Sequence, residues 1–136
     1  MPIENAERIR QILKDAKSIA VVGASPKPWR DSGRIAQFLM EKRYTVFPVN
    51  PNYDEVLGRE CFPNLASIAQ RVDIVDIFRR PEAVPPIVEE AIRVGARTVW
   101  MQLGVVNPGA AARAEEGGLE VIMDRCIAIE YRRLIE

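Results

Sequence analysis

Short apolar runs, each closed by a turn and followed by a segment of helical spacing, constrain the fold of this chain more than any other feature. The runs cover residues 19–22, 45–49, 72–78, 98–103 and 119–123. Continuous apolar runs of this length are typical of strands buried on both faces of a parallel sheet. Strands that alternate with helices pair in parallel through right-handed crossovers. The pattern therefore predicts a doubly wound α/β fold, with a mainly parallel sheet and helices on both of its faces.

Apolar residues at helical spacing fill the intervals between the runs. They predict an opening amphipathic helix at residues 9–16. We expect Asp31 or Ser32 to cap the second helix and Gly95 to end the helix after the third run. Pro108 stands where a further helix begins, and a last helix closes the chain.

Weaker signals interrupt this pattern at a few positions. Pro48 lies in the second run, although proline cannot donate to a central ladder. Asp73 and Asp76 lie in the third run, where we expect them to hydrogen-bond to backbone or to neighbouring loops. A short edge strand is expected at residues 61–62, followed by a short helix at residues 65–69.

Length and charge limit the classes of protein that this chain can represent. Its 136 residues fit one domain, with residues 1–17 forming an N-terminal helix that packs on it. A content of 48% hydrophobic and 28% charged residues excludes a disordered chain. Lys and Arg together number 19, as do Asp and Glu. This balance provides no overall field for nucleic acid or an anionic membrane, so any anion binding must be local.

The absence of histidine excludes several kinds of chemistry. Without an imidazole there is no Ser-His-Asp or Cys-His nucleophile, no phospho-histidine carrier and no histidine-ligated metal, and we expect no metal site. Cys61 and Cys126 lie far apart without metal-ligand spacing, which indicates a reducing compartment. No apolar run approaches the ~20 residues of a membrane span, and the first residues lack a signal-peptide pattern. We therefore expect a cytoplasmic protein.

Candidate binding residues follow the carboxyl ends of the predicted strands, where open parallel sheets bind their ligands. The loop after the first run is the most informative. Gly23 permits a tight turn, and the helix after the loop offers free N–H groups to a phosphate. Ser25 and Ser32 add hydroxyl donors, while Lys27 and Arg30 add positive charge. A lone glycine after a strand is as often a simple turn, so Gly23 by itself identifies no ligand.

The same loop differs from the dinucleotide fingerprint G-x-G-x-x-G. Ser25 stands two residues after Gly23, and Gly33 comes too late for the third glycine. The second run ends in Asn50 and Pro51, so no carboxylate is placed to bind a ribose 2′-hydroxyl. NAD is therefore disfavoured, and a ligand with phosphate on its ribose is tolerated or preferred.

Arg79 and Arg80 follow the third run, and guanidinium groups bind phosphate bidentately. Taken alone, they are equally well interpreted as solvated loop charges or partners of nearby acids. Together with Lys27 and Arg30, they favour a multiply charged anion at this edge of the sheet. Gln102, at the end of the fourth run, either donates to a ligand amide or simply finishes its strand.

Several blocks of the sequence resemble a known family. They are GASPKPWRDSGRIAQFL, FPVNPNYDEVLG, VDIVDIFRRPEAVPPIVEEAI, TVWMQLGVVN and MDRCIAIEYRRL. From about Ser18 to the C-terminus the chain resembles the small stand-alone CoA-binding domain proteins. It is similar to the Rossmann-type N-terminal domain of the succinyl-CoA synthetase α subunit and of related acyl-CoA synthetases. The resemblance implies a Rossmann-like fold with coenzyme A as the cofactor.

The resemblance also implies how the site is divided. It places the phosphates at the first loop, the adenosine at the second strand end, the rest of the nucleotide at the third and the pantetheine arm at the fourth. With Lys27 added from the charge pattern, the candidate cofactor-binding residues are, in that order, Gly23, Ala24, Ser25, Lys27, Arg30 and Ser32; Asn50 and Pro51; Phe78, Arg79, Arg80 and Pro81; and Gln102, Leu103 and Gly104.

The departures from the synthetases determine the expected function. Those enzymes pass phosphate through a histidine on a second domain and bind nucleotide on an ATP-grasp unit, and this sequence matches neither part. We therefore expect a non-catalytic coenzyme A or acyl-CoA binding protein with no catalytic residue. Two alternatives stay open: a regulatory or partner subunit that acts with an acyl-CoA synthetase-type protein in trans, and a pyridine-nucleotide sensor on the same fold. Self-association also stays open, and no nucleic-acid or membrane partner is expected.

Overall fold

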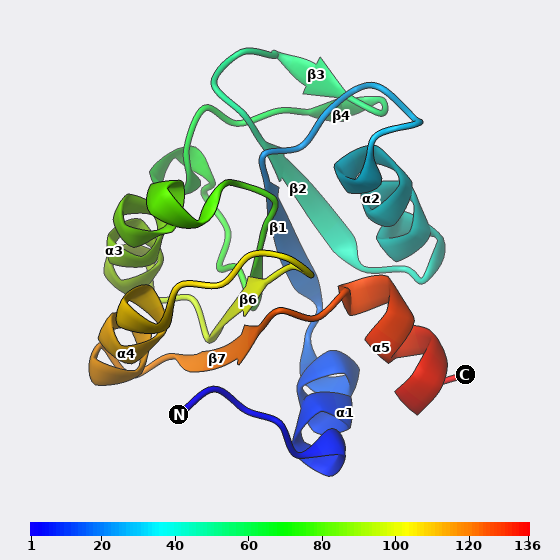
Figure 1. The fold of residues 1–136 in the computed structure, drawn as a ribbon. Helices are drawn as coiled ribbons and strands as arrows, with labels where there is room; N and C mark the ends of the chain where they lie inside the picture. The colour runs from blue at the N-terminus through cyan, green and yellow to red at the C-terminus, as the bar shows by residue number, and fades with distance from the viewer.

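Residues 1–136 form a five-stranded sheet with helices on both faces in the computed structural model (Figure 1). The strand order is β2-β1-β5-β6-β7, and every neighbouring pair is parallel. This confirms the predicted doubly wound, Rossmann-like α/β fold. The elements in chain order are α1 (Ala6–Asp15), β1 (Ser18–Val22), α2 (Asp31–Glu41), β2 (Thr45–Val49), β3 (Glu55–Val56), β4 (Arg59–Glu60), η1 (Leu65–Ser67), β5 (Ile74–Ile77), η2 (Pro81–Ala83), α3 (Val84–Val94), β6 (Thr98–Met101), α4 (Pro108–Glu116), β7 (Glu120–Met123) and α5 (Ile127–Leu134).

Each face of the sheet buries its own apolar core. Val75 and Ile77 of β5 belong to the cluster that includes residues of α3 and α4. Ile74 of β5 and Trp100 of β6 belong to the cluster that includes residues of α1, α2 and α5. Figure 1 shows these two groups of helices on opposite sides of the strands. Because both faces are covered, nearly every position of the central strands is apolar. This explains why apolar and polar residues do not alternate along the runs.

The helices begin and end largely where the sequence indicates. Gly95 ends α3 in the left-handed conformation, with φ of 76°, as predicted. Pro108 is the first residue of α4, and the Asn107 side chain accepts a hydrogen bond of 3.0 Å from the backbone N–H of Ala110. The buried Ile9 and Leu13 fix α1 against the sheet and α5. None of the helices is both long and apolar enough to cross a bilayer.

Three local predictions differ from the structure. The residue at the N-cap of α2 is Arg30, not Asp31 or Ser32, and it makes no side-chain capping bond. The edge strand expected at residues 61–62 is reduced to an isolated bridge between Phe62 and Val49, and the short helix at 65–69 is the 3₁₀ helix η1. The hairpin of β3 and β4 has no counterpart among the predicted elements.

Pro48 is tolerated because β2 is an edge strand. The backbone N–H of Thr45 bonds to the Lys17 carbonyl, so the N–H groups of alternate residues face β1 and the position of Pro48 faces outward. On that outer side, the Pro48 carbonyl accepts a hydrogen bond of 2.9 Å from Phe62. The proline therefore interrupts no bond of the sheet.

The two acids of the third run have opposite environments. Asp73 bonds to backbone, as predicted: its Oδ2 accepts from the backbone N–H groups of Lys17, at 2.8 Å, and Ser18, at 3.2 Å. For Asp76 the prediction of a hydrogen bond is wrong. Its side chain is fully buried between β1 and β6, and neither carboxylate oxygen has a partner. Burial raises the pKa of Asp76 well above its ordinary value.

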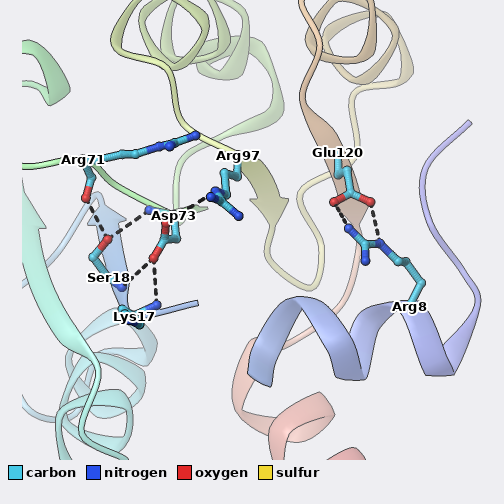
Figure 2. A network of polar contacts seen from close by, with 7 residues as sticks. All are labelled: Arg8, Lys17, Ser18, Arg71, Asp73, Arg97 and Glu120. Atoms are coloured by element: carbon cyan, nitrogen blue, oxygen red, sulfur yellow. Dashed lines mark hydrogen bonds and ion pairs between the residues drawn. The ribbon is translucent and has the colours of Figure 1, made fainter. Parts of the chain in front are cut away.

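Polar contacts close the amino-terminal edge of the sheet, opposite the predicted site (Figure 2). Arg8 of α1 donates from Nε to Glu120 of β7 at 2.7 Å and pairs with it through a second nitrogen. Ser18 Oγ donates to the Arg71 carbonyl at 2.9 Å, beside the Asp73 contacts. The first contact holds α1 against β7, and the second group joins the start of β1 to the segment before β5.

Candidate ligand-binding site

The loop between β1 and α2 is built around Gly23, whose φ is 88°. A Cβ at this position would lie 2.5 Å from the Phe78 carbonyl oxygen and 3.0 Å from Arg79 Cδ. Only glycine therefore lets the first loop pass so close to the end of β5. The second strand fixes the loop from its other side, because the Gly23 N–H donates to the Val49 carbonyl at 2.9 Å.

Asn50 connects the first loop to the turn after β2. Its Nδ2 donates to the Ala24 carbonyl at 2.9 Å, and its Oδ1 accepts from the backbone N–H of Asn52 at 2.9 Å. Because both ends of the amide are engaged, the two loops are held at one spacing. Asn50 thus positions the loops in addition to lining the space between them.

The first turn of α2 faces this loop with free backbone N–H groups. The cap residue Arg30 supplies no side-chain acceptor, so its helix end keeps unsatisfied donors and the positive end of the helix dipole. Gly33 lets the loop pack tightly here, since a Cβ would lie 2.5 Å from the Lys27 carbonyl oxygen. Ser25 Oγ accepts from the Lys27 N–H at 3.2 Å, which stiffens the same segment.

Three adjoining hollows run along the carboxyl ends of the strands. The first-loop hollow has a volume of about 380 Å³, the turn hollow about 580 Å³ and the helix hollow about 710 Å³. The first-loop hollow is lined by Gly23, Ser25, Lys27, Arg30, Asp31, Ser32, Asn50, Tyr53 and Phe78. The turn hollow is lined by Gly23, Asn50, Pro51, Asn52, Arg79, Arg80, Glu82 and Ala83. The helix hollow, between α2 and α5, is lined by Asp31, Arg34, Ile35, Phe38, Phe78, Arg79, Arg80, Pro81, Gln102, Leu103, Gly104, Val105, Cys126, Ala128, Ile129 and Arg132.

Shared residues make the three hollows one continuous crevice. Gly23 and Asn50 line both the first-loop and turn hollows, and Arg79 and Arg80 line both the turn and helix hollows. Every candidate residue except Ala24 lines one of the three. Ala24 is fully buried and contributes its carbonyl to Asn50 instead. The structure thus brings the candidates from four strand ends to a single edge, as the crevice rule predicts.

Four of the cations that line the crevice form no ion pair with a neighbouring acid. Lys27, Arg30, Arg79 and Arg80 take part in none of the ion pairs of the structure. Asp31, which also lines the crevice, is paired with Arg34. Guanidinium and ammonium groups without carboxylate partners remain available to phosphate oxygens.

Gln102 combines a structural contact with its place in the helix hollow. The side chain is only 5% exposed, and its Oε1 accepts a hydrogen bond of 2.9 Å from the backbone N–H of Ile127. It therefore ties the end of β6 to the first turn of α5. The amide nitrogen of Gln102 makes no hydrogen bond within the protein. It is therefore available as a donor at the wall of the helix hollow.

The two cysteines occupy different environments. Cys61 is buried, its Sγ lies 3.5 Å from the Asn50 carbonyl oxygen as a donor, and burial raises the pKa of its thiol. It lines none of the three hollows. Cys126 is half-buried and lines the helix hollow at the start of α5. A ligand that fills this hollow would therefore meet Cys126 and not Cys61.

Sequence reasoning missed the contribution of the last helix to the crevice. Ala128, Ile129 and Arg132 line the helix hollow, but the helical period of Ile127 and Tyr131 marks only the face that packs inward. The residues on the side of α5 line the hollow only because α2 lies opposite them. The periodicity of a single sequence does not show which helices face each other. The available signal in the sequence was Ile129, an apolar residue that lies off the helical period of Ile127 and Tyr131. In the structure its side chain is 51% exposed.

Comparisons with known proteins match this geometry. Residues 17–132 match the family model described as CoA binding domain. The chain is 40% identical to the uncharacterized protein YneT of Bacillus subtilis, over 90% of this chain and 91% of that protein. It is 39% identical to an ADP-forming acetate–CoA ligase of Archaeoglobus fulgidus, over 83% of this chain but only 18% of the ligase.

Solved structures agree with the sequence comparisons. A hypothetical protein from Pyrococcus horikoshii superposes with a TM-score of 0.96 at 43% identity, over 100% of this chain and 97% of that one. From its family match, its close relatives and its fold, the chain is a member of the CoA binding domain family.

Proposed function

We propose that this protein binds coenzyme A or an acyl-CoA along the crevice and carries out no chemistry on it. The observation that carries the proposal is the convergence of Lys27, Arg30, Arg79 and Arg80, all without ion pairs, on the glycine loop and the free N–H groups of α2. Coenzyme A brings a pyrophosphate and a ribose 3′-phosphate, so it needs several cations at separate points. Family membership supports coenzyme A as the particular anion.

The composition of the hollows supports one orientation of the ligand. Two of nine lining residues are hydrophobic in the first-loop hollow and one of eight in the turn hollow, against eight of sixteen in the helix hollow. The phosphates and ribose therefore fit the two polar hollows. The pantetheine arm, which is less polar, fits the helix hollow past Phe78 and Gln102. Arg79 and Arg80 lie where the two parts meet.

Calorimetric titration with coenzyme A, dephospho-coenzyme A and NAD tests this proposal. Coenzyme A is expected to bind at least about tenfold more tightly than dephospho-coenzyme A, because one charge-assisted hydrogen bond contributes about 1.5–3 kcal/mol. Coenzyme A at ~100 times its dissociation constant should also stabilise the fold by about 2.7 kcal/mol. Equal affinity for coenzyme A and dephospho-coenzyme A would show that the arginines do not bind the 3′-phosphate. Binding of NAD alone would favour the pyridine-nucleotide alternative.

A second candidate function is that of a coenzyme A carrier that acts with a synthetase-type protein in trans. The similarity to one part of the Archaeoglobus ligase, 18% of its length, favours it, because in that protein the matching part is joined to further sequence. Leu103, 64% exposed at the rim of the helix hollow, offers an apolar contact for such a partner. We expect an ATP-grasp protein to co-purify with the tagged wild-type protein and to be lost when Leu103 is replaced by Ala. Recovery independent of Leu103 would contradict this assignment of the surface.

A further inference from the structure

From the strand ends, the helix hollow continues beside the sheet, between the facing sides of α2 and α5. Ile35 and Phe38 are one turn apart on α2, and Ile129 and Arg132 are one turn apart on α5. The two helices pack against each other beside the sheet. Three residues of helix rise about 4.5 Å, so the walls run about this far back from the strand ends along the side of the sheet. This extension lies outside the part of the hollow assigned to the pantetheine arm.

Both walls of the extension carry apolar side chains, next to the charged Arg34 of α2 and Arg132 of α5. Ile35 and Ala128 form the buried parts of the two walls, at 9% and 4% exposure. Ile129 is 51% exposed beside them and is one of the few large apolar side chains that the fold leaves open to solvent. Exposed apolar side chains beside a ligand crevice are removed from water when a ligand covers them. The occupant should therefore be apolar where it meets these helices.

The far end of the extension is closed by a stacked pair. The Arg132 guanidinium carbon lies 4.5 Å from the centroid of the Phe38 ring, and the Phe38 ring meets Tyr131 edge-on at 5.6 Å. Arg132 is exposed to solvent and pairs with no carboxylate. A single exposed cation contributes little to binding a carboxylate, because solvent screens the pair, whereas the proposed phosphate site combines four cations with free backbone N–H groups. The pair therefore limits the length of an occupant more than it attracts a charged one.

We infer that the space between α2 and α5 receives the acyl group of a short acyl-CoA, and that Ile129 and Phe38 select for its length. This inference rests on the proposed function, since it requires the phosphates and pantetheine arm of the same ligand to occupy the rest of the crevice. The thioester end leaves the strand ends near Gln102 and Cys126, directly before the two apolar walls. The protein then discriminates acyl-CoA from free coenzyme A by contact with the acyl methylenes.

Calorimetry with free coenzyme A, acetyl-CoA, butyryl-CoA, decanoyl-CoA and succinyl-CoA tests the inference. Affinity is expected to rise by up to about fourfold for each methylene added between acetyl-CoA and butyryl-CoA, the ratio that burial of one methylene provides. It should rise no further at decanoyl-CoA, because the chain then passes the Arg132–Phe38 pair. Equal affinity for free coenzyme A and butyryl-CoA would overturn the acyl site while leaving coenzyme A binding intact. Absence of binding to all five ligands would instead refute the proposed function.

Two variants test whether the walls formed by α2 and α5 cause the preference for the acyl chain. Ile129→Ala is expected to remove most of the preference for butyryl-CoA over free coenzyme A, measured as the ratio of the two dissociation constants, so that any change in the binding of the shared coenzyme A part cancels. Val106→Ala is the matched control, because Val106 is also an exposed aliphatic residue, at 42%, but does not line the helix hollow. Phe38→Ala opens the far end and should shift the preferred chain length upward, a change that a purely structural role would not produce. An unchanged ligand series in both Ile129→Ala and Phe38→Ala, or tighter binding of succinyl-CoA than of butyryl-CoA, would contradict the inference.

Discussion

Gln102 Oε1 accepts a hydrogen bond of 2.9 Å from the backbone N–H of Ile127 at a place where both residues are buried. The bond holds α5 against the end of β6 and so fixes one wall of the helix hollow. Replacement by Leu leaves the Ile127 N–H without an acceptor, and an unsatisfied buried group costs about 1–3 kcal/mol. Gln102→Leu should therefore lower the free energy of unfolding by that amount in urea titrations.

Leu103→Ala provides the control for this prediction. Leu103 is adjacent in sequence but is 64% exposed, so its replacement should change the free energy of unfolding by less than about 0.5 kcal/mol. If Gln102→Leu is as stable as Leu103→Ala, the Gln102 bond does not hold α5 in place.

Gly23 and Gly104 allow a test of why the first loop requires glycine. Their φ angles are nearly the same, at 88° and 87°, but only at Gly23 would a Cβ collide with backbone. Gly104→Ala should cost the ordinary strain of a left-handed alanine, about 1 kcal/mol. Gly23→Ala should cost more and also weaken coenzyme A binding, because the loop must move away from Phe78. Equal losses of stability in the two variants, measured by urea unfolding, would show that the contact with Phe78 is not limiting.

Much of the fold could be predicted because local signals and burial agree. The continuous apolar runs report a sheet covered on both faces, and Gly95 and Pro108 mark helix ends by backbone conformation alone. The hairpin between β3 and β4 was missed for the opposite reason. Its turn places Leu57 at φ of 53° and Gly58 at φ of 75°, and leucine is disfavoured in that region. Packing of Leu57 against the core cluster stabilises the turn, and this is a tertiary effect without a local signal.

The candidate site shows the same division. Its residues at the strand ends follow from chain order and the crevice rule, so Gly23, Arg79 and Gln102 could be named in advance. The contributions of Phe38 and Ile129 depend on the packing of α2 beside α5, which no local pattern specifies. Asp76 is a third case. Its position in the strand was evident, but its lack of any partner appears only when β1 and β6 enclose it.

Asp76 should make stability depend on pH. The unfolded carboxyl ionises near pH 3.9, whereas burial raises the pKa of Asp76 in the folded protein. Folding therefore takes up a proton between these two pKa values, and stability falls by up to about 1.4 kcal/mol for each pH unit of increase in this window. Asp76→Asn, a neutral substitute of similar shape, removes this dependence. The free energy of unfolding of the variant should match the wild type near pH 4 and exceed it increasingly as the pH rises.

Urea titrations of both proteins from pH 4 to pH 8 measure this difference. A constant difference across the range would mean that Asp76 does not titrate between the two states. Circular dichroism at each pH confirms that both proteins are folded before denaturant is added.

The Arg8–Glu120 pair in Figure 2 should matter little for either stability or binding. The two side chains are 46% and 36% exposed, so solvent screens their attraction. Arg8→Ala should lower the free energy of unfolding by less than about 1 kcal/mol, and the loss should shrink as salt is added. Coenzyme A affinity should not change, because the pair lies at the amino-terminal edge of the sheet. Arg10→Ala, whose partner Glu7 is on the same helix, serves as the control. A weaker affinity in Arg8→Ala alone would contradict the assignment of binding to the opposite edge.

Coenzyme A binding at the carboxyl ends of the strands is tested most directly by titration of coenzyme A into the double variant Arg79→Ala/Arg80→Ala, with urea unfolding measured on the same preparation. Arg59→Ala/Arg71→Ala is the matched control, because these two arginines are also exposed, form no ion pair and line none of the hollows. Both variants change the net charge equally. The first variant is expected to bind coenzyme A at least about tenfold more weakly with its stability unchanged, and the second to bind like the wild type. Equal coenzyme A affinity in the two variants would contradict binding at the carboxyl ends of the strands.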